Sequence, residues 1–160
     1  MKARQVALVV GLAAAVTLTS VAAASADAAR QRVEITSNLY PRREFVLAPL
    51  QAGPLKRDSG SARIVYMTWG RRVHNGQDVE ILRAYFAFEG KRGTLTIRER
   101  TEWLDAGDGA GGPSIATGTW KVVRGTGQYA KIAGGGRSAH SGLGGTNPWY
   151  ARQEGFFTHP

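Results

Sequence analysis

The residue best placed to do chemistry is Glu99, which lies in an alternating stretch at residues 94–103. It shares the apolar face of this predicted strand with Leu95, Ile97 and Trp103, while threonine and charged side chains occupy the other face. A carboxylate that points into a core must be paired or protonated, because stranding it costs several kcal/mol. Glu99 is therefore either a structural group tied to a neighbour or the polar feature of an apolar binding pocket.

The candidate partners of Glu99 lie on neighbouring predicted strands. Tyr66, Tyr85 and Arg83 each carry a group that can bond to a carboxylate. If the pocket interpretation is correct, a ligand site in the interior of the fold is predicted, formed by Glu99, Tyr66, Tyr85, Arg83 and Trp103.

Other chemistry-bearing residues show no pattern of a catalytic or metal site. No two histidines have metal-ligand spacing, and each is expected at the surface, in or beside a turn or terminus; they are His74, His140 and His159. Asp105 and Asp108 are interpreted as turn residues, because the spacing of a calcium loop is missing. The chain has no cysteine, and we predict no metal and no cofactor.

The stretch at residues 118–140 must position much of the fold. It begins with a β-branched and aromatic run, is broken at Gly125 and Gly127, and is broken again by glycines at 134–136. A helix through it would lose roughly 1 kcal/mol for each glycine. We therefore predict a strand, a sharp corner and a returning strand, which also excludes a dinucleotide fingerprint at the first glycines.

Strand-like segments follow one another along the chain without an amphipathic helix. Residues 63–69 have two apolar faces and are expected to be covered on both sides. Asn75-Gly76 predicts a hairpin to residues 79–89. Such a meander leaves exposed edges unless it closes, so we predict an all-β fold, a small closed antiparallel β-barrel of about eight strands.

The N-terminus is predicted to be a secretory signal peptide. A basic start is followed by an apolar run and the small-residue cleavage site Ala24-Ser25-Ala26, which places the signal peptide at residues 1–26. Residues 27–160 are then one β-barrel domain, with a less regular segment at 27–61. A secreted protein without a stable membrane span after cleavage is expected.

Charge gives a weaker indication of partners. The 160-residue chain has a formal net charge of +9, and its basic pairs fall in predicted turns among glutamates. No nucleic-acid-binding module is recognisable, so nucleic acid is not an expected partner. Because two predicted strands are apolar on both faces, a homo-oligomer is also expected.

Residues 118–136 read GTWKVVRGTGQYAKIAGGG. This string resembles the G-x-W-x-V-x-x-G-T-G-x-Y signature of secreted bacterial calycin-like β-barrels, which are similar to the allene oxide cyclase and dirigent barrels. The resemblance extends roughly over residues 64–157 and includes the closing EGFF. It implies a barrel fold; for activity it offers only an analogy at the level of fold.

The function expected from the sequence is therefore a non-catalytic binding module for a small apolar ligand or a surface partner. The alternative is an isomerase or cyclase that works by confining its substrate in the barrel, as the resemblance to allene oxide cyclase suggests. An empty interior around Glu99 would favour ligand binding or confinement, and a packed interior would favour a surface partner.

Overall fold

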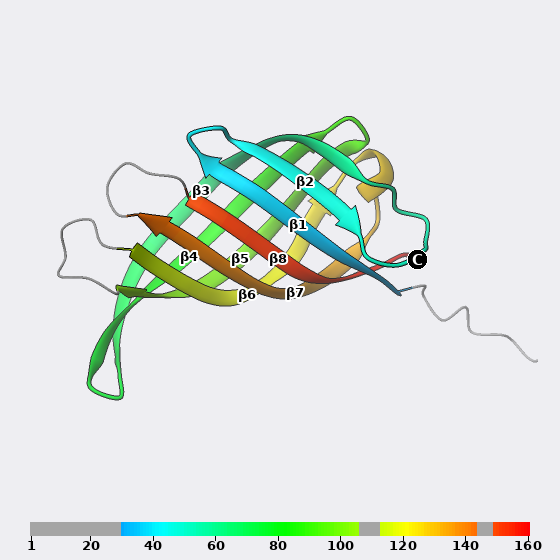
Figure 1. Ribbon diagram of the computed structural model, residues 1–160. Helices are drawn as coiled ribbons and strands as arrows, with labels where there is room; N and C mark the ends of the chain where they lie inside the picture. The colour runs from blue at the N-terminus through cyan, green and yellow to red at the C-terminus, as the bar shows by residue number, and fades with distance from the viewer. Residues whose placement is uncertain (1–29, 106–112, 144–148) are drawn as a thin grey trace, which may run out of the picture.

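The computed structural model of the chain describes residues 30–105, 113–143 and 149–160. Within them, eight antiparallel strands form a closed barrel in which each strand pairs with its neighbours in sequence (Figure 1). The predicted closed all-β barrel is confirmed. The strands are β1 (Arg30–Tyr40), β2 (Glu44–Pro49), β3 (Asp58–His74), β4 (Gln77–Gly90), β5 (Gly93–Asp105), β6 (Pro113–Gly125), β7 (Ala133–Leu143) and β8 (Trp149–Thr158).

The barrel closes because β1 pairs with both β2 and β8. Val33, for example, lies opposite Pro49 on one side and Gly155 on the other. The segment at residues 27–61, expected to be less regular, supplies β1, β2 and the start of β3. Closure leaves no free edge where the first and last strands meet.

The predicted corners are present. Asn75 and Gly76 both have positive φ, 51° and 78°, as a type I′ hairpin turn requires. The corner after β6 contains a short 3₁₀ turn, Gly127–Tyr129, before β7 returns. The strand, corner and returning strand predicted for residues 118–140 are therefore confirmed. The second break predicted at residues 134–136 was wrong, because β7 runs through these glycines in regular pairing with its neighbours.

One end of the barrel is tied together by a buried carboxylate, Asp58. It accepts hydrogen bonds from the backbone N–H groups of Ser59 (2.9 Å), Lys91 (3.1 Å) and Arg92 (3.2 Å). The hydroxyl of Tyr129 donates a further bond of 3.0 Å. Because these groups come from the start of β3, the β4–β5 turn and the β6–β7 corner, Asp58 holds three parts of the chain together across this end.

The interior is filled by inward-facing side chains of all eight strands. Its largest fully buried members include Trp120, Phe86, Phe88 and Phe157. The indole N–H of Trp120 is shared by the backbone oxygens of Arg137 (3.0 Å) and Glu154 (3.2 Å), on β7 and β8. The core therefore also connects strands that are distant from Trp120 in sequence.

The first part of β3 does not have two covered faces, so that prediction was wrong. Val65, Tyr66, Met67 and Trp69 are each between 44 and 58% exposed. The reason is that β2 pairs with β3 only as far as Ser61, so the residues that follow have a neighbouring strand on the β4 side alone. The β3–β4 hairpin extends beyond the end of β2 in Figure 1.

The predicted signal peptide at residues 1–26 lies outside the described residues. Asp108, which was interpreted as a turn residue, also lies outside them, whereas Asp105 is the last residue of β5. In the described part of the chain, no helix has the length and apolar character needed to cross a membrane.

Candidate functional site

Glu99 points into the barrel from the middle of β5. It lies opposite Ala84 of β4 and Trp120 of β6, and only 2% of the residue is exposed. The alternation of β5 predicted this orientation, and the structure confirms it.

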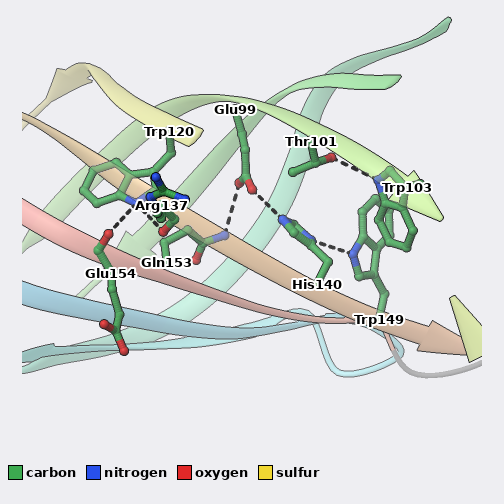
Figure 2. A network of polar contacts seen from close by, with 9 residues as sticks. All are labelled: Glu99, Thr101, Trp103, Trp120, Arg137, His140, Trp149, Gln153 and Glu154. Atoms are coloured by element: carbon green, nitrogen blue, oxygen red, sulfur yellow. Dashed lines mark hydrogen bonds and ion pairs between the residues drawn. The ribbon is translucent and has the colours of Figure 1, made fainter. Parts of the chain in front are cut away.

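The carboxylate is bound by two side chains from strands that do not pair with β5 (Figure 2). Nε2 of His140 on β7 lies 2.5 Å from one Glu99 oxygen. The amide of Gln153 on β8 donates to the other oxygen at 3.2 Å. A third group, the indole N–H of Trp149, donates to Nδ1 of His140 at 2.9 Å.

The bond from Trp149 fixes the protonation pattern of the His140 ring. An indole N–H only donates, so Nδ1 must accept and carries no proton. The ring proton is then on Nε2, which donates it to Glu99. His140 is thus a neutral imidazole with both nitrogens engaged, and it has no free nitrogen to act as a base on a ligand.

Aromatic rings surround this histidine. The ring centroids of Trp103, Trp149 and Phe86 lie 5.7, 5.9 and 6.2 Å from that of His140. Trp103 donates its indole N–H to Thr101 at 3.0 Å, so its own polar group is also satisfied. The surroundings therefore exclude water from the His140–Glu99 contact.

The side chains at the centre of the network are closed off from solvent. The side chains of His140 and Glu99 are 0% and 1% exposed. Nearby inward-facing polar atoms, the hydroxyls of Ser37 and Ser138 and the Gln153 amide oxygen, are buried without hydrogen-bond partners. Among the described residues, no group of three potential metal ligands is present. Glu99, His140 and Trp149 therefore form a buried hydrogen-bond network in which every donor has an acceptor, beside a few buried oxygens that have no partner.

Of the five residues predicted to form an interior site, Glu99 and Trp103 lie inside the barrel. Tyr66, Arg83 and Tyr85 do not, and their placement in the interior was wrong. On β4, Arg83 and Tyr85 alternate with the buried Leu82, Ala84 and Phe86, so they must face outward. On β3, a β-bulge between Ile64 and Tyr66 turns Tyr66 to the outside, where it is 58% exposed.

The actual partners of Glu99 were missed by the sequence interpretation. His140 was predicted at the surface and is buried, because β7 continues through the glycine-rich run to Leu143. Gln153 was not predicted to contact Glu99. The available signal was the alternation of Ser138 with His140, and of Trp149, Ala151 and Gln153 on the last strand.

Tyr66, Arg83 and Tyr85, the three residues that face outward, line a shallow groove of about 440 Å³ on the outer face of β3 to β6. Its outward side chains form two rows across the four strands, because each residue lies opposite one on the next strand. The first row is Tyr66, Tyr85, Arg98 and Lys121, and the second is Thr68, Arg83, Arg100 and Thr119. We call this surface the basic groove.

The basic groove brings like charges directly opposite one another. Arg83 faces Arg100, and Arg98 faces Lys121. Arg100 has a carboxylate partner, Glu102, at 2.9 Å. In the part of the chain that the structure describes, no ion pair involves Arg83, Arg98 or Lys121. The groove therefore carries uncompensated positive charge.

Glu102 forms the acidic border of this groove. Partial burial acts to raise the pKa of its carboxyl, but the hydrogen bonds and charges of Arg72 and Arg100 outweigh it and hold the pKa below its usual value. Glu102 is therefore anionic at neutral pH and compensates the charges of Arg72 and Arg100. Within the described residues, it forms no ion pair with the other cationic side chains of the groove.

A larger depression, of about 740 Å³, lies over β7, β8 and β1 and the adjoining strands. Small side chains such as Ala139 and Ser141 line it beside Tyr150. Its arginine, Arg152, is paired with Glu34 at 2.6 Å and also with Glu154. This depression has no feature that selects a ligand chemistry.

Comparison with known proteins gave no assignment. No protein-family model matches the sequence, and the searches of curated proteins and of solved structures found no match. The resemblance to the calycin-like barrels accordingly stays a prediction.

Proposed function

We propose that the protein is a non-catalytic binding protein that uses the outside of its barrel, at the basic groove, to bind an acidic polysaccharide. The observation that carries the proposal is the placement of two pairs of like charges directly opposite one another, Arg83 with Arg100 and Arg98 with Lys121, in which only Arg100 has an ion-pair partner among the described residues. Like charges directly opposite on a sheet are destabilising. A bound anion would remove that cost, so the groove is better suited to the bound state than to the free one.

The side chains fit carboxylate or sulfate groups. Each arginine offers a planar fork that binds such groups through two parallel hydrogen bonds. Cross-strand neighbours lie about 5 Å apart, so the two rows offer several cationic sites close together. Repeated anionic groups on one chain could occupy these sites at the same time, which favours a polymer over a single ion.

The tyrosines favour sugar rings over bases. Tyr66 and Tyr85 lie side by side with ring centroids 6.4 Å apart and planes tilted by 60°. At this angle the two rings present separate faces and not one continuous stacking surface. Each ring can instead pack its face against a separate sugar unit.

The functions inside the barrel have less support. A small apolar ligand or a confined substrate needs space beside Glu99, and His140 and Gln153 occupy that position. The predicted export is compatible with a polysaccharide partner outside the cell. The predicted homo-oligomer is not needed for this function.

The test is calorimetric titration of the purified protein with oligogalacturonate at low salt. In the test variant, Arg98→Gln is combined with Lys121→Gln. The matched control combines Arg42→Gln with Lys56→Gln, which removes the same charge from exposed positions outside the groove. We expect the groove variant to bind about tenfold or more weakly, and the control to change by less than about threefold.

Two parallel titrations define the partner class. Neutral dextran should not bind, and oligothymidylate should bind more weakly than oligogalacturonate. Equal losses in the two variants would mean that only net charge matters and would contradict the proposed site. Tighter binding of oligothymidylate would replace the polysaccharide with nucleic acid as the partner.

A further inference from the structure

The barrel wall leaves one side of β3 unpaired over much of its length. β2 pairs only with residues 58–61 of β3, and the last bond on that side runs from the Ala62 N–H to the Arg43 oxygen at 2.7 Å. On its other side β3 pairs with β4 as far as His74. Among the described residues, nothing pairs with the open side of residues 63–74. Every second residue there presents its backbone N–H and C=O outward.

This open edge is long and apolar. Val65, Met67, Trp69 and Val73 on it are between 44 and 70% exposed. Protein edges of this kind are normally blunted by charged side chains, proline, bulges or inward-pointing charge. Residues 63–74 contain no lysine and no proline, and their three arginines lie toward the two ends, at Arg63, Arg71 and Arg72, so that residues 64–70 carry no charge. Its bulge lies at the start, between Ile64 and Tyr66, so the rest of the edge remains regular.

We propose that residues 63–74 are a strand-addition site for an extended segment of a partner protein. The segment would form a ninth strand beside β3, with backbone hydrogen bonds supplying affinity and alternate side chains supplying specificity. The affinity in this proposal comes from the β3 backbone and the apolar face of the hairpin, which polysaccharide binding does not use. The two sites meet at Tyr66, Thr68 and Arg83, which also belong to the basic groove.

The chemistry of the partner follows from the two faces of β3. On one face the added strand would meet Met67 and Trp69, so its residues there should be apolar. On the other face it would lie beside Tyr66 and Thr68, two strands, or about 10 Å, from Arg83. Glutamate on that face can reach toward this unpaired arginine, so the segment should alternate apolar and acidic residues.

A second copy of the chain fits the edge less well. Residues 63–74 contain three arginines and a histidine and no acidic residue. Antiparallel self-pairing centred on Met67 would place Arg63 of each copy opposite Arg71 of the other. These arginines have partners on β4, Glu89 and Glu80, but each whole chain has a net charge of +9, which opposes self-association.

The experiment uses a synthetic peptide of about eight residues that alternates valine and glutamate. Amide hydrogen exchange of the full-length protein is followed residue by residue by NMR, with and without the peptide. We expect alternate amides of residues 63–74 to exchange at least about tenfold more slowly with the peptide. An otherwise identical peptide with lysine in place of glutamate should have no effect.

Variants separate this edge from general stickiness. Trp69→Lys should abolish the protection, whereas Tyr150→Lys, an exposed aromatic on β8, should leave it unchanged. The proposal is overturned if the valine–glutamate peptide protects none of these amides. It is also overturned if they are already protected in the free protein and sedimentation shows a dimer, since a second copy then occupies the edge.

Discussion

Glu99 shows how a buried carboxylate can be structural even where its position resembles a ligand site. Its two oxygens accept from His140 and Gln153, and Trp149 holds His140 in the tautomer that donates. The group crosses the barrel from β5 to β7 and β8. Its role is therefore to fix β5 relative to two strands with which it shares no backbone pairing.

Two substitutions of Glu99 should test that role, because the loss in the free energy of unfolding should depend on whether the new side chain can still accept hydrogen bonds. In Glu99→Gln, the new amide oxygen still accepts from His140, and Gln153 can turn its unpartnered oxygen toward the new N–H group. We expect a loss of less than about 1 kcal/mol in the free energy of unfolding. Glu99→Leu leaves two buried donors without acceptors and should cost about 3 kcal/mol or more.

Urea unfolding of both variants measures this difference. If Gln proves as costly as Leu, the negative charge itself stabilises the fold, and the neutral His140 derived from the Trp149 bond is wrong.

At the level of single residues, the sequence predicted the inward face of β5 but not the partners of Glu99. Strict alternation in one strand is a local property, so Glu99 and Trp103 could be placed. The contact with His140 depends on pairing across a closed barrel. It also depends on β7 continuing through Gly134–Gly136, where glycine normally indicates a turn.

Between elements, Tyr129 and Asp58 connect the β6–β7 corner to the start of β3. Burial, with the nearby Asp58 carboxylate, raises the pKa of the Tyr129 hydroxyl well above its usual value. The unfolded chain then loses this proton at a lower pH than the folded protein. The stabilisation is fully present below about pH 10 and is lost as pH rises further.

Tyr129→Phe should remove this part of the alkaline dependence. We expect the free energy of unfolding of the wild-type protein to fall more steeply above about pH 10 than that of the variant, measured by urea unfolding at a series of pH values. Tyr150→Phe, an exposed tyrosine, serves as the control and should keep the wild-type slope. Parallel curves for all three proteins would contradict the shift at Tyr129.

The corner between β6 and β7 contains a glycine, Gly127, whose close packing can be tested by substitution. Gly127 has a φ of 58°, and a Cβ there would lie 2.1 Å from the Arg92 backbone oxygen. Gly76 also has a positive φ, 78°, but a Cβ there meets nothing within 4 Å. Gly76→Ala should cost about 1 kcal/mol, from backbone conformation alone.

Gly127→Ala should cost about 2 kcal/mol more than Gly76→Ala, because it adds a clash with the turn between β4 and β5. The urea midpoints of the two variants give the comparison. Equal losses would show that the corner can move away from Arg92, and that its close contact is not required.

For the elements, turn chemistry predicted the hairpin at Asn75-Gly76 and the corner at residues 125–127, because both depend on residues that tolerate positive φ. The bulge in β3 could not be predicted, since no residue type marks it. That single extra residue reverses the side-chain faces beyond Ile64 and places Tyr66 outside.

At the scale of the whole molecule, the barrel separates a closed interior from a charged exterior. The basic groove exists only because the register aligns arginines and Lys121 from β4, β5 and β6. In the sequence these residues are spread from Arg83 to Lys121. The glutamates between them do not pair with Arg83, Arg98 or Lys121 in the described part of the folded barrel. The net charge could be read from the composition, whereas the position of the groove could be found only once the strand order and register were known.

The central claim is that binding occurs on the outside of a barrel whose interior stays closed. The most direct measurement is an NMR titration of the isotope-labelled protein with oligogalacturonate, followed at each residue. If the basic groove is the binding site, the shifts centre on Tyr66, Arg98 and Lys121, while the Trp149 indole N–H and the His140 ring signals stay in place. Shifts centred on His140, Trp149 and Gln153, with the groove unchanged, would contradict it.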